Sequence, residues 1–271
     1  MNNIIEMFSF TFMQRAFIVG ILISLCSSLI GVTLVLKRNS MIGDGLSHVG
    51  FGAFAIATVL GFTPLEFAIP VVMVISFLIL KLDDNSNIHG DSLIALVSAS
   101  SLAIGTFVIS ITKGVNTDIN NYLFGSILSL NESDVIISIV LSIIVILLYI
   151  FLFNRIFIIT FDERFAKSIG IKTNIYNIVL ALICSIVVVL GMRLMGSLLI
   201  SSLLIFPTIT SMQIFKTFKK VVISSVFVSI ISFVIGLFIS YMYATPTGAT
   251  IVIINLSMLL LFIFISKIRR N

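Results

Sequence analysis

The sequence has little charge and few of the residue types that build catalytic or metal centres. Lys, Arg, Asp and Glu make up 10% of the 271 residues, whereas about 25% is usual in a soluble domain. The chain has two histidines, two cysteines and no tryptophan. The low charge excludes an ordinary soluble domain. The short supply of nucleophiles and ligands makes an intramembrane enzyme a poor interpretation.

Several motifs are also absent, and each absence removes a class of function. No G-x-x-x-x-G-K-[ST] phosphate loop occurs, so we do not expect the chain to bind ATP itself. Neither H-E-x-x-H nor G-x-S-x-G occurs. Lys and Arg stand singly or in twos and threes, which argues against a nucleic-acid partner. Cys26 and Cys184 lie inside apolar runs and are interpreted as small buried hydrophobic residues.

What the chain has instead is long apolar runs. Hydrophobic residues make up 59% of the sequence, and the mean hydropathy is +1.26. A helix needs about 20 apolar residues to cross a bilayer. Nine runs approach this length: residues 16–36, 46–61, 65–80, 92–111, 135–153, 175–191, 194–212, 221–243 and 250–265. The first is too long for a signal-peptide core and is expected to be retained. The sequence therefore predicts an all-α polytopic membrane protein in which residues 1–271 form one transmembrane domain.

The loops between these runs differ in positive charge. If alternate loops lie on opposite sides, 13 of the 16 Lys and Arg fall on one side. These are Lys37, Arg38, Lys81, Arg155, Arg164, Lys167, Lys172, Lys216, Lys219, Lys220, Lys267, Arg269 and Arg270. Because Lys and Arg concentrate in cytoplasmic loops, this pattern predicts a cytoplasmic C-terminus and an external N-terminus, and it favours an odd number of spans.

A polar segment opens the second run. Residues 37–48 read Lys-Arg-Asn-Ser-Met-Ile-Gly-Asp-Gly-Leu-Ser-His, with Asp44 and His48 four residues apart on one helix face. A carboxylate and an imidazole suit a divalent transition metal, or they can pass a proton. The alternative is that Asp44 is a first-turn carboxylate favoured by the helix dipole, with His48 as its polar neighbour. In the predicted topology the pair lies near the inner end of its helix, unless packing draws that helix deeper.

Two further segments carry local signals. Between residues 161 and 171, apolar residues recur at helical spacing and charged residues fill the other face, which predicts a short amphipathic helix on the cytoplasmic surface. A solvated linker is the alternative. Pro207, inside the seventh run, is expected to kink or break that helix. Ser201 and Ser202 before it are expected to satisfy freed backbone groups or to pack against a neighbouring helix.

Four motifs occur together in a fixed order. They are Val35-Leu36-Lys37-Arg38 with Gly43-Asp44-Gly45-Leu46-Ser47-His48; Tyr122-Leu123-Phe124-Gly125-Ser126-Ile127-Leu128; Phe161-Asp162-Glu163-Arg164-Phe165-Ala166 with Gly170-Ile171; and Gly196-Ser197-Leu198-Leu199 through Leu204-Ile205-Phe206-Pro207, followed by Pro246-Thr247-Gly248-Ala249-Thr250-Ile251-Val252. The set resembles the permease subunits of the metal-ion ABC importers, which take up zinc, manganese or iron. The resemblance extends from about Gln14 to Val252. Two departures are Gly45, where Ala is common, and Ala244-Thr245, where the family often has an acidic residue.

The resemblance implies a permease that alternates between outward- and inward-facing states. It implies three protein partners: a cytoplasmic ATPase that hydrolyses ATP, an extracellular metal-binding lipoprotein and a second copy of the permease. It also implies that Asp44 and His48 line the metal path and that no cofactor is permanently bound, the divalent metal being the substrate. Its ATPase-coupling residues would be Asp162, Glu163, Arg164, Phe165, Ala166, Lys167 and Gly170.

The alternative function is a secondary transporter that is driven by protons or sodium and acts without an ATPase. Such carriers often contain inverted repeats, and no clear repeat is present. The physiological metal stays open, because Asp and His accept manganese, zinc and iron alike.

Overall fold

The computed structural model describes residues 7–85, 90–112, 125 and 131–270, and these are helical without any strand. The helices are α2 (Thr11–Leu36), α3 (Met41–Leu60), α4 (Pro64–Asn85), α5 (Gly90–Ile111), α7 (Glu132–Phe161), α8 (Glu163–Ser168), α9 (Thr173–Met195), α10 (Ser197–Ile214), α11 (Phe218–Tyr243) and α12 (Thr247–Arg270). Within these ranges, nine helices are long and apolar enough to cross a membrane, all but the six-residue α8. The predicted fold class is confirmed.

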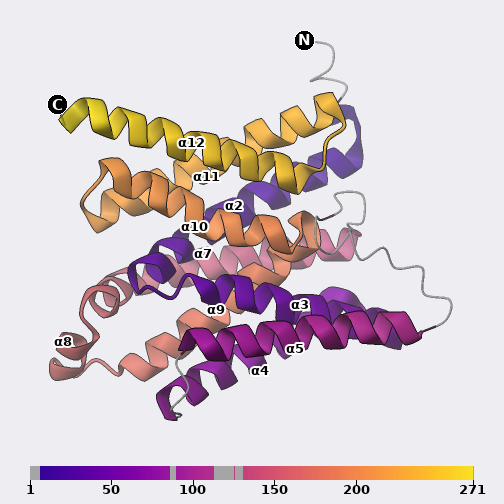
Figure 1. Cartoon of the computed structure of the whole chain (residues 1–271), viewed down its shortest axis with the longest axis horizontal. Helices are drawn as coiled ribbons and strands as arrows, with labels where there is room; N and C mark the ends of the chain where they lie inside the picture. The colour runs from indigo at the N-terminus through magenta and orange to yellow at the C-terminus, as the bar shows by residue number, and fades with distance from the viewer. Residues whose placement is uncertain (1–6, 86–89, 113–124, 126–130, 271) are drawn as a thin grey trace.

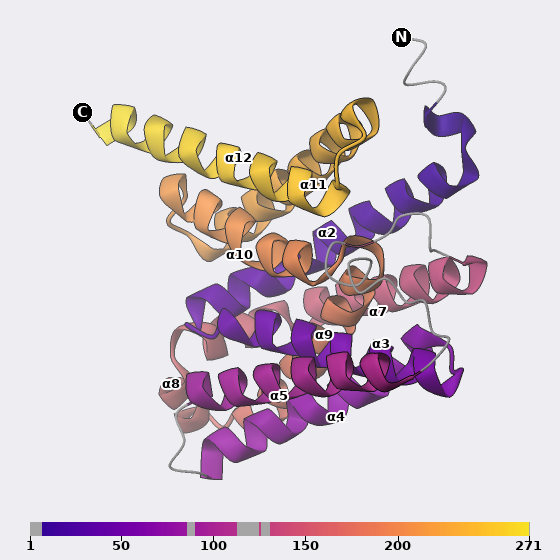
Figure 2. The same ribbon diagram turned by 45° about the vertical axis from the view of Figure 1, so that its right-hand side comes forward.

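The core of the bundle lies along α2 and α9. In each, 72% of the most apolar stretch is buried. Helix α2 contacts α7, α9, α10 and α11, and α9 contacts α3, α4 and α10 besides. Helices α5 and α12 lie on opposite sides of the bundle, with only 17% of their apolar stretch buried (Figures 1 and 2). Both helices therefore leave Leu and Phe side chains uncovered within this chain.

Small residues let the central helices approach closely. A Cβ atom at Gly31 of α2 would overlap the backbone carbonyl oxygen of Leu204 in α10, and one at Gly52 of α3 would lie 2.8 Å from the carbonyl oxygen of Ser101 in α5. Helices in lipid associate through such close packing, because lipid tails are as apolar as leucine. The glycines therefore permit the close approach of α2 to α10 and of α3 to α5.

Several predicted helix ends were wrong. Residues 154–161, predicted to begin a connecting loop, instead extend α7, where Phe157 and Phe161 pack on Phe218 of α11 with ring centroids 5.3 and 6.0 Å apart. Helix α9 continues through Gly191 and ends at Met195, because Gly196 makes the turn with a φ of 81°. Of the two outcomes predicted for Pro207, a kink or a break, the break does not occur, because α10 continues to Ile214.

Helix α2 begins on one side of the bundle and α12 ends on the other, as an odd number of spans requires (Figure 1). The ends of α2 and α4 and the start of α9 lie on the same side as α8. The motif at residues 122–128 falls outside the described residues, apart from Gly125.

Candidate metal centre

Asp44 and His48 lie in the first two turns of α3, which begins at Met41. Oδ2 of Asp44 is 3.7 Å from Nε2 of His48. Their side chains are 46% and 29% exposed, and both line an open cleft of about 280 Å³ between α3 and α5. A carboxylate oxygen and an imidazole nitrogen thus point into one accessible space, which is an arrangement that can bind a divalent ion.

Ser201 of α10 holds the other carboxylate oxygen. Its hydroxyl donates a hydrogen bond of 2.9 Å to Oδ1 of Asp44. One oxygen of Asp44 is therefore fixed by α10, while the second faces His48. A backbone contact was predicted for Ser201, and its hydroxyl does lie 3.2 Å from the Ser197 carbonyl oxygen of its own helix. The contact with Asp44 was not predicted, because the two residues are 157 positions apart.

The same contact places the pair deep in the bundle. Helices α3 and α10 run in opposite directions (Figure 1). At a rise of 1.5 Å per residue, Asp44 lies roughly 5 Å from the start of α3 and Ser201 roughly 6 Å from the start of α10. Residues near the starts of two antiparallel helices can meet only if the helices overlap over their first turns. Asp44 and Ser201 therefore meet part-way along the bundle, with the rest of α3 extending to one side of the contact and the rest of α10 to the other.

One chain provides few further ligands at this point. Asp91 of α5 lines the same cleft, but the described part of the chain contains no group of three or more His, Cys, Asp or Glu residues placed to hold a metal ion. Divalent transition metals usually take at least four ligands. Asp44 and His48 therefore make an incomplete ligand set, and their partial exposure leaves room for ligands from elsewhere.

The segment predicted to contact an ATPase contains the short helix α8. The Asp162 side chain begins it by accepting a hydrogen bond of 2.9 Å from the backbone N–H of Phe165, and Gly170, with a φ of 84°, follows its end. The helix is shorter than the predicted amphipathic segment, because α7 includes Phe161. Ala166 is buried, whereas Phe165 and Ile169 are 55% and 51% exposed. Most of the predicted apolar face is thus open to solvent.

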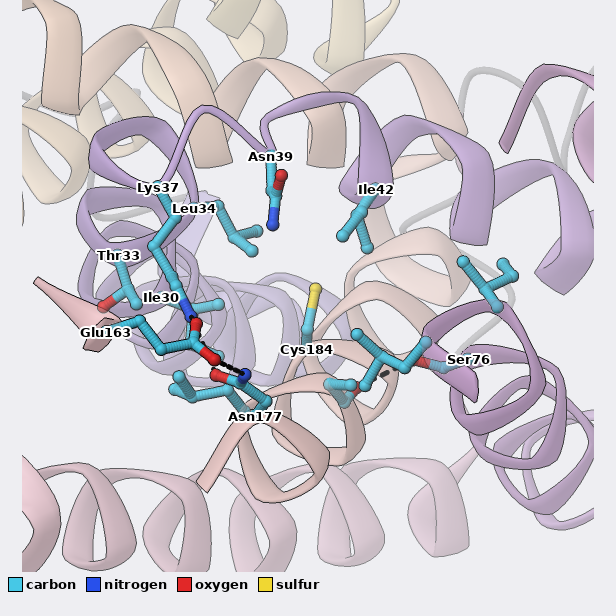
Figure 3. Close-up of a pocket in the computed structure, with 14 residues that line it drawn as sticks. Ile30, Thr33, Leu34, Lys37, Asn39, Ile42, Ser76, Glu163, Asn177 and Cys184 are labelled. Carbon is cyan, nitrogen blue, oxygen red and sulfur yellow. Dashed lines mark hydrogen bonds and ion pairs between the residues drawn. The ribbon is translucent and has the colours of Figure 1, made fainter. Parts of the chain in front are cut away.

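A polar network joins α8 to the rest of the bundle. Nζ of Lys37 lies 3.5 Å from Oε2 of Glu163 and donates a hydrogen bond of 2.7 Å to Oδ1 of Asn177. Nδ2 of Asn177 donates to Oε1 of Glu163 at 3.2 Å. Lys167 also pairs with Glu163, at 3.2 Å. Figure 3 shows the first three side chains together at one end of a cavity of about 260 Å³.

The environment shifts both charged groups of this network. Burial lowers the pKa of Lys37, and the charge of Glu163 opposes that effect. Burial alone would raise the pKa of Glu163, but Lys37, Lys167 and Asn177 together outweigh it and leave this pKa below its ordinary value.

Comparison with known proteins identifies the fold and the family. A model of the ABC 3 transport family matches residues 9–267. The chain belongs to the ABC 3 transport family. The resemblance inferred from the four motifs is thereby confirmed. The nine apolar helices among the described residues make this family member a multi-pass protein of the cell membrane.

Two relatives in this family have names that state a metal. The manganese import system permease protein ScaB of Streptococcus gordonii is 31% identical over 96% of this chain and 94% of its own length. The high-affinity zinc uptake system membrane protein ZnuB of Haemophilus influenzae is 27% identical over 94% of this chain and 98% of its own.

Two solved structures share the fold. PsaBC from Streptococcus pneumoniae, in complex with Fab, superposes with a TM-score of 0.86 at 30% identity, covering 96% of this chain and 94% of that one. An inward-facing metal-chelate type ABC transporter superposes with a TM-score of 0.76 at 16% identity, covering 93% and 85%. At that identity the second structure supports the fold alone.

Proposed function

We propose that this protein is the transmembrane permease subunit of an ATP-driven importer for divalent transition-metal ions, with manganese, zinc or iron as the transported substrate. The observation that carries the proposal is the pairing of Asp44 with His48 deep in the bundle, with Ser201 holding the carboxylate. The names of ScaB and ZnuB support manganese and zinc as the class of substrate.

In this proposal Asp44 provides an anionic oxygen and His48 a neutral imidazole nitrogen, a donor set that suits borderline divalent ions. Two ligands from one chain bind an ion without trapping it. A second copy of the permease completes the set with its own pair. The half-exposed Asp44 carboxylate and the open cleft between α3 and α5 leave space for these additional ligands.

Transport in one direction requires a coupled energy source. We assign it to a cytoplasmic ATPase that binds the segment at residues 161–171, with Phe165 as its apolar anchor and Arg164 and Lys167 at the rim. An extracellular metal-binding lipoprotein delivers the ion, and the permease pair alternates between outward- and inward-facing states. The exposed Phe165 side chain supports this assignment, because buried aromatic anchors account for much of the energy of protein interfaces.

The ligand assignment is tested by measuring manganese and zinc uptake in cells that carry Asp44→Asn or His48→Ala. Each variant should abolish uptake without lowering the amount of permease in the membrane. Ser98→Ala is a matched control, because Ser98 lines the same cleft but, within the part of the chain that the structure describes, its hydroxyl bonds to the Ile94 carbonyl of its own helix. Wild-type uptake by His48→Ala would show that the pair is ordinary polarity at a helix start.

The orientation is tested by labelling single cysteines introduced at Asn2 and Asn271 with a membrane-impermeant reagent. The native Cys26 and Cys184 are buried and should not react. We expect Asn2→Cys to label from outside the cell and Asn271→Cys only after the membrane is opened. Labelling of both positions from one side would contradict nine spans.

A further inference from the structure

The polar network around Lys37 joins two parts of the molecule that are far apart in the chain. Lys37 caps the C-terminal end of α2, Glu163 is the first residue of α8, and Asn177 lies in the second turn of α9. The apolar contacts of the buried Ala166 of α8 are local, with Ile159 of α7 and Ile171 before α9. The link from Glu163 to Lys37, in contrast, spans 126 positions and reaches the central helix of the bundle.

Lys37 is also held firmly to the start of α3. The backbone N–H of Asn39 donates to the Leu34 carbonyl at 2.9 Å, and that of Ile42 donates to the Asn39 carbonyl at 3.2 Å. Arg38, between Lys37 and Asn39, takes a left-handed backbone conformation with a φ of 61°, which is costly for a non-glycine residue. The connection from α2 to α3 is therefore a tight turn, so displacing Lys37 displaces the start of the helix that carries Asp44.

A cavity beside the network leaves free volume next to the α2–α3 turn, into which Lys37 and the start of α3 can move. Its lining includes Lys37, Glu163 and Asn177 at one end, and Asn39 and Ile42 from the α2–α3 turn and the first turn of α3 (Figure 3). Protein interiors are otherwise close-packed and transmit strain. The turn thus borders packed helices on one side and free volume on the other.

We propose that Lys37, Glu163 and Asn177 form a latch that fixes α8 to the end of α2, so that movement of α8 changes the position of α3 and of its metal ligands. This inference rests on the proposed function, in which α8 contacts the ATPase and Asp44 and His48 bind the ion. The three latch residues are positioning residues, because they touch neither the ion nor ATP. Their chemistry fits the role: without Lys37, Glu163 keeps its contacts with Lys167 of α8 and Asn177 of α9, but the tie from α8 to α2 is lost.

The test uses the complete importer, reconstituted in lipid vesicles with its ATPase and its metal-binding protein. Manganese uptake and ATP hydrolysis are measured together, and the bound ATPase is quantified. Lys37→Gln should lower the manganese transported per ATP hydrolysed by about tenfold while the ATPase stays bound.

Asn177→Ala, which lies outside the ATPase-coupling segment, should also lower the manganese transported per ATP hydrolysed. Lys37→Arg, which keeps the positive charge, should retain most of the wild-type ratio of manganese transported to ATP hydrolysed. Lys172→Gln, an exposed lysine in the loop that follows α8, is the matched control and should be neutral.

A second measurement on the isolated permease does not depend on transport. Backbone amide exchange in α8 and in residues 37–44 should be about tenfold faster in Lys37→Gln than in the wild type. A normal transport ratio in both Lys37→Gln and Asn177→Ala would overturn the latch. If the wild-type complex moved no metal, the proposed function would fail, and the latch would then stand or fall on the exchange rates alone.

Discussion

The Ser201 hydroxyl on α10 donates a hydrogen bond to Oδ1 of Asp44 on α3. It leaves Oδ2 of the carboxylate directed towards Nε2 of His48, 3.7 Å away. The metal-binding geometry proposed for α3 therefore depends on a second helix. Any motion of α10 relative to α3 changes how the carboxylate is presented.

We predict that Ser201→Ala weakens manganese binding by about 10- to 100-fold, the usual cost of losing a group that orients a metal ligand. The measurement is the concentration dependence of manganese uptake, with the amount of permease held equal. Ser202→Ala is the matched control, because the neighbouring Ser202 hydroxyl is buried and has no hydrogen-bond partner among the residues described. Equal affinities for the two variants would show that the Ser201 contact does not orient Asp44.

Phe165→Ala should uncouple ATP hydrolysis from transport while leaving the permease folded. Its side chain is 55% exposed in the free chain, so truncation removes little from the permease core but costs about 2 kcal/mol if the ring is an interface anchor. Affinity for the ATPase, measured with purified proteins, should fall accordingly. Phe151→Ala is the control, because Phe151 is 86% exposed within the membrane span of α7. Normal assembly and transport by Phe165→Ala would mean that α8 is only a surface linker.

Gly31→Ala should force α2 and α10 apart. A Cβ atom at this position would overlap the carbonyl oxygen of Leu204, and a backbone atom cannot rotate away as a side chain can. Overpacking of this kind typically costs about 1–3 kcal/mol. We expect a lower thermal unfolding temperature in detergent and weaker manganese uptake, because α10 also carries Ser201. An unchanged unfolding temperature would contradict the close approach of the two helices.

Asp134 and Arg193 form a shielded ion pair between α7 and α9, with Oδ2 of Asp134 3.3 Å from Nη2 of Arg193 and side chains 9% and 13% exposed. Asp134→Leu alone should destabilise the fold by about 1.5–3 kcal/mol, because the shielded guanidinium of Arg193 loses the two hydrogen bonds that it donates to Oδ2 of Asp134. The double variant Asp134→Leu with Arg193→Met should recover most of this loss. Unfolding in detergent measures both. A double variant no more stable than the single one would show that the loss does not come from the guanidinium left behind in Asp134→Leu.

Much of the architecture could be predicted from the sequence. Apolar runs long enough to span a bilayer are a local property of the sequence. The uneven placement of Lys and Arg predicts on which side of the membrane successive loops lie. The position of Asp44 and His48 on one face of α3 follows from their spacing of four residues. Helix ends were harder, as α7 shows: its last turns are stabilised by Phe218, more than 50 residues later, which no local pattern indicates.

The tertiary structure decided which side chains meet. No periodicity links Asp44 to Ser201, or Lys37 to Glu163 and Asn177, and these contacts span 157, 126 and 140 positions. They depend on how closely α2, α3 and α10 pack, which glycines such as Gly31 permit but do not by themselves specify. The sequence determined that the protein lies in a membrane, how many apolar spans it has and which side chains each helix provides. The depth of the metal pair and its mechanical link to α8 arise only when the helices pack, because hydrogen bonds and ion pairs form across space and not along the chain.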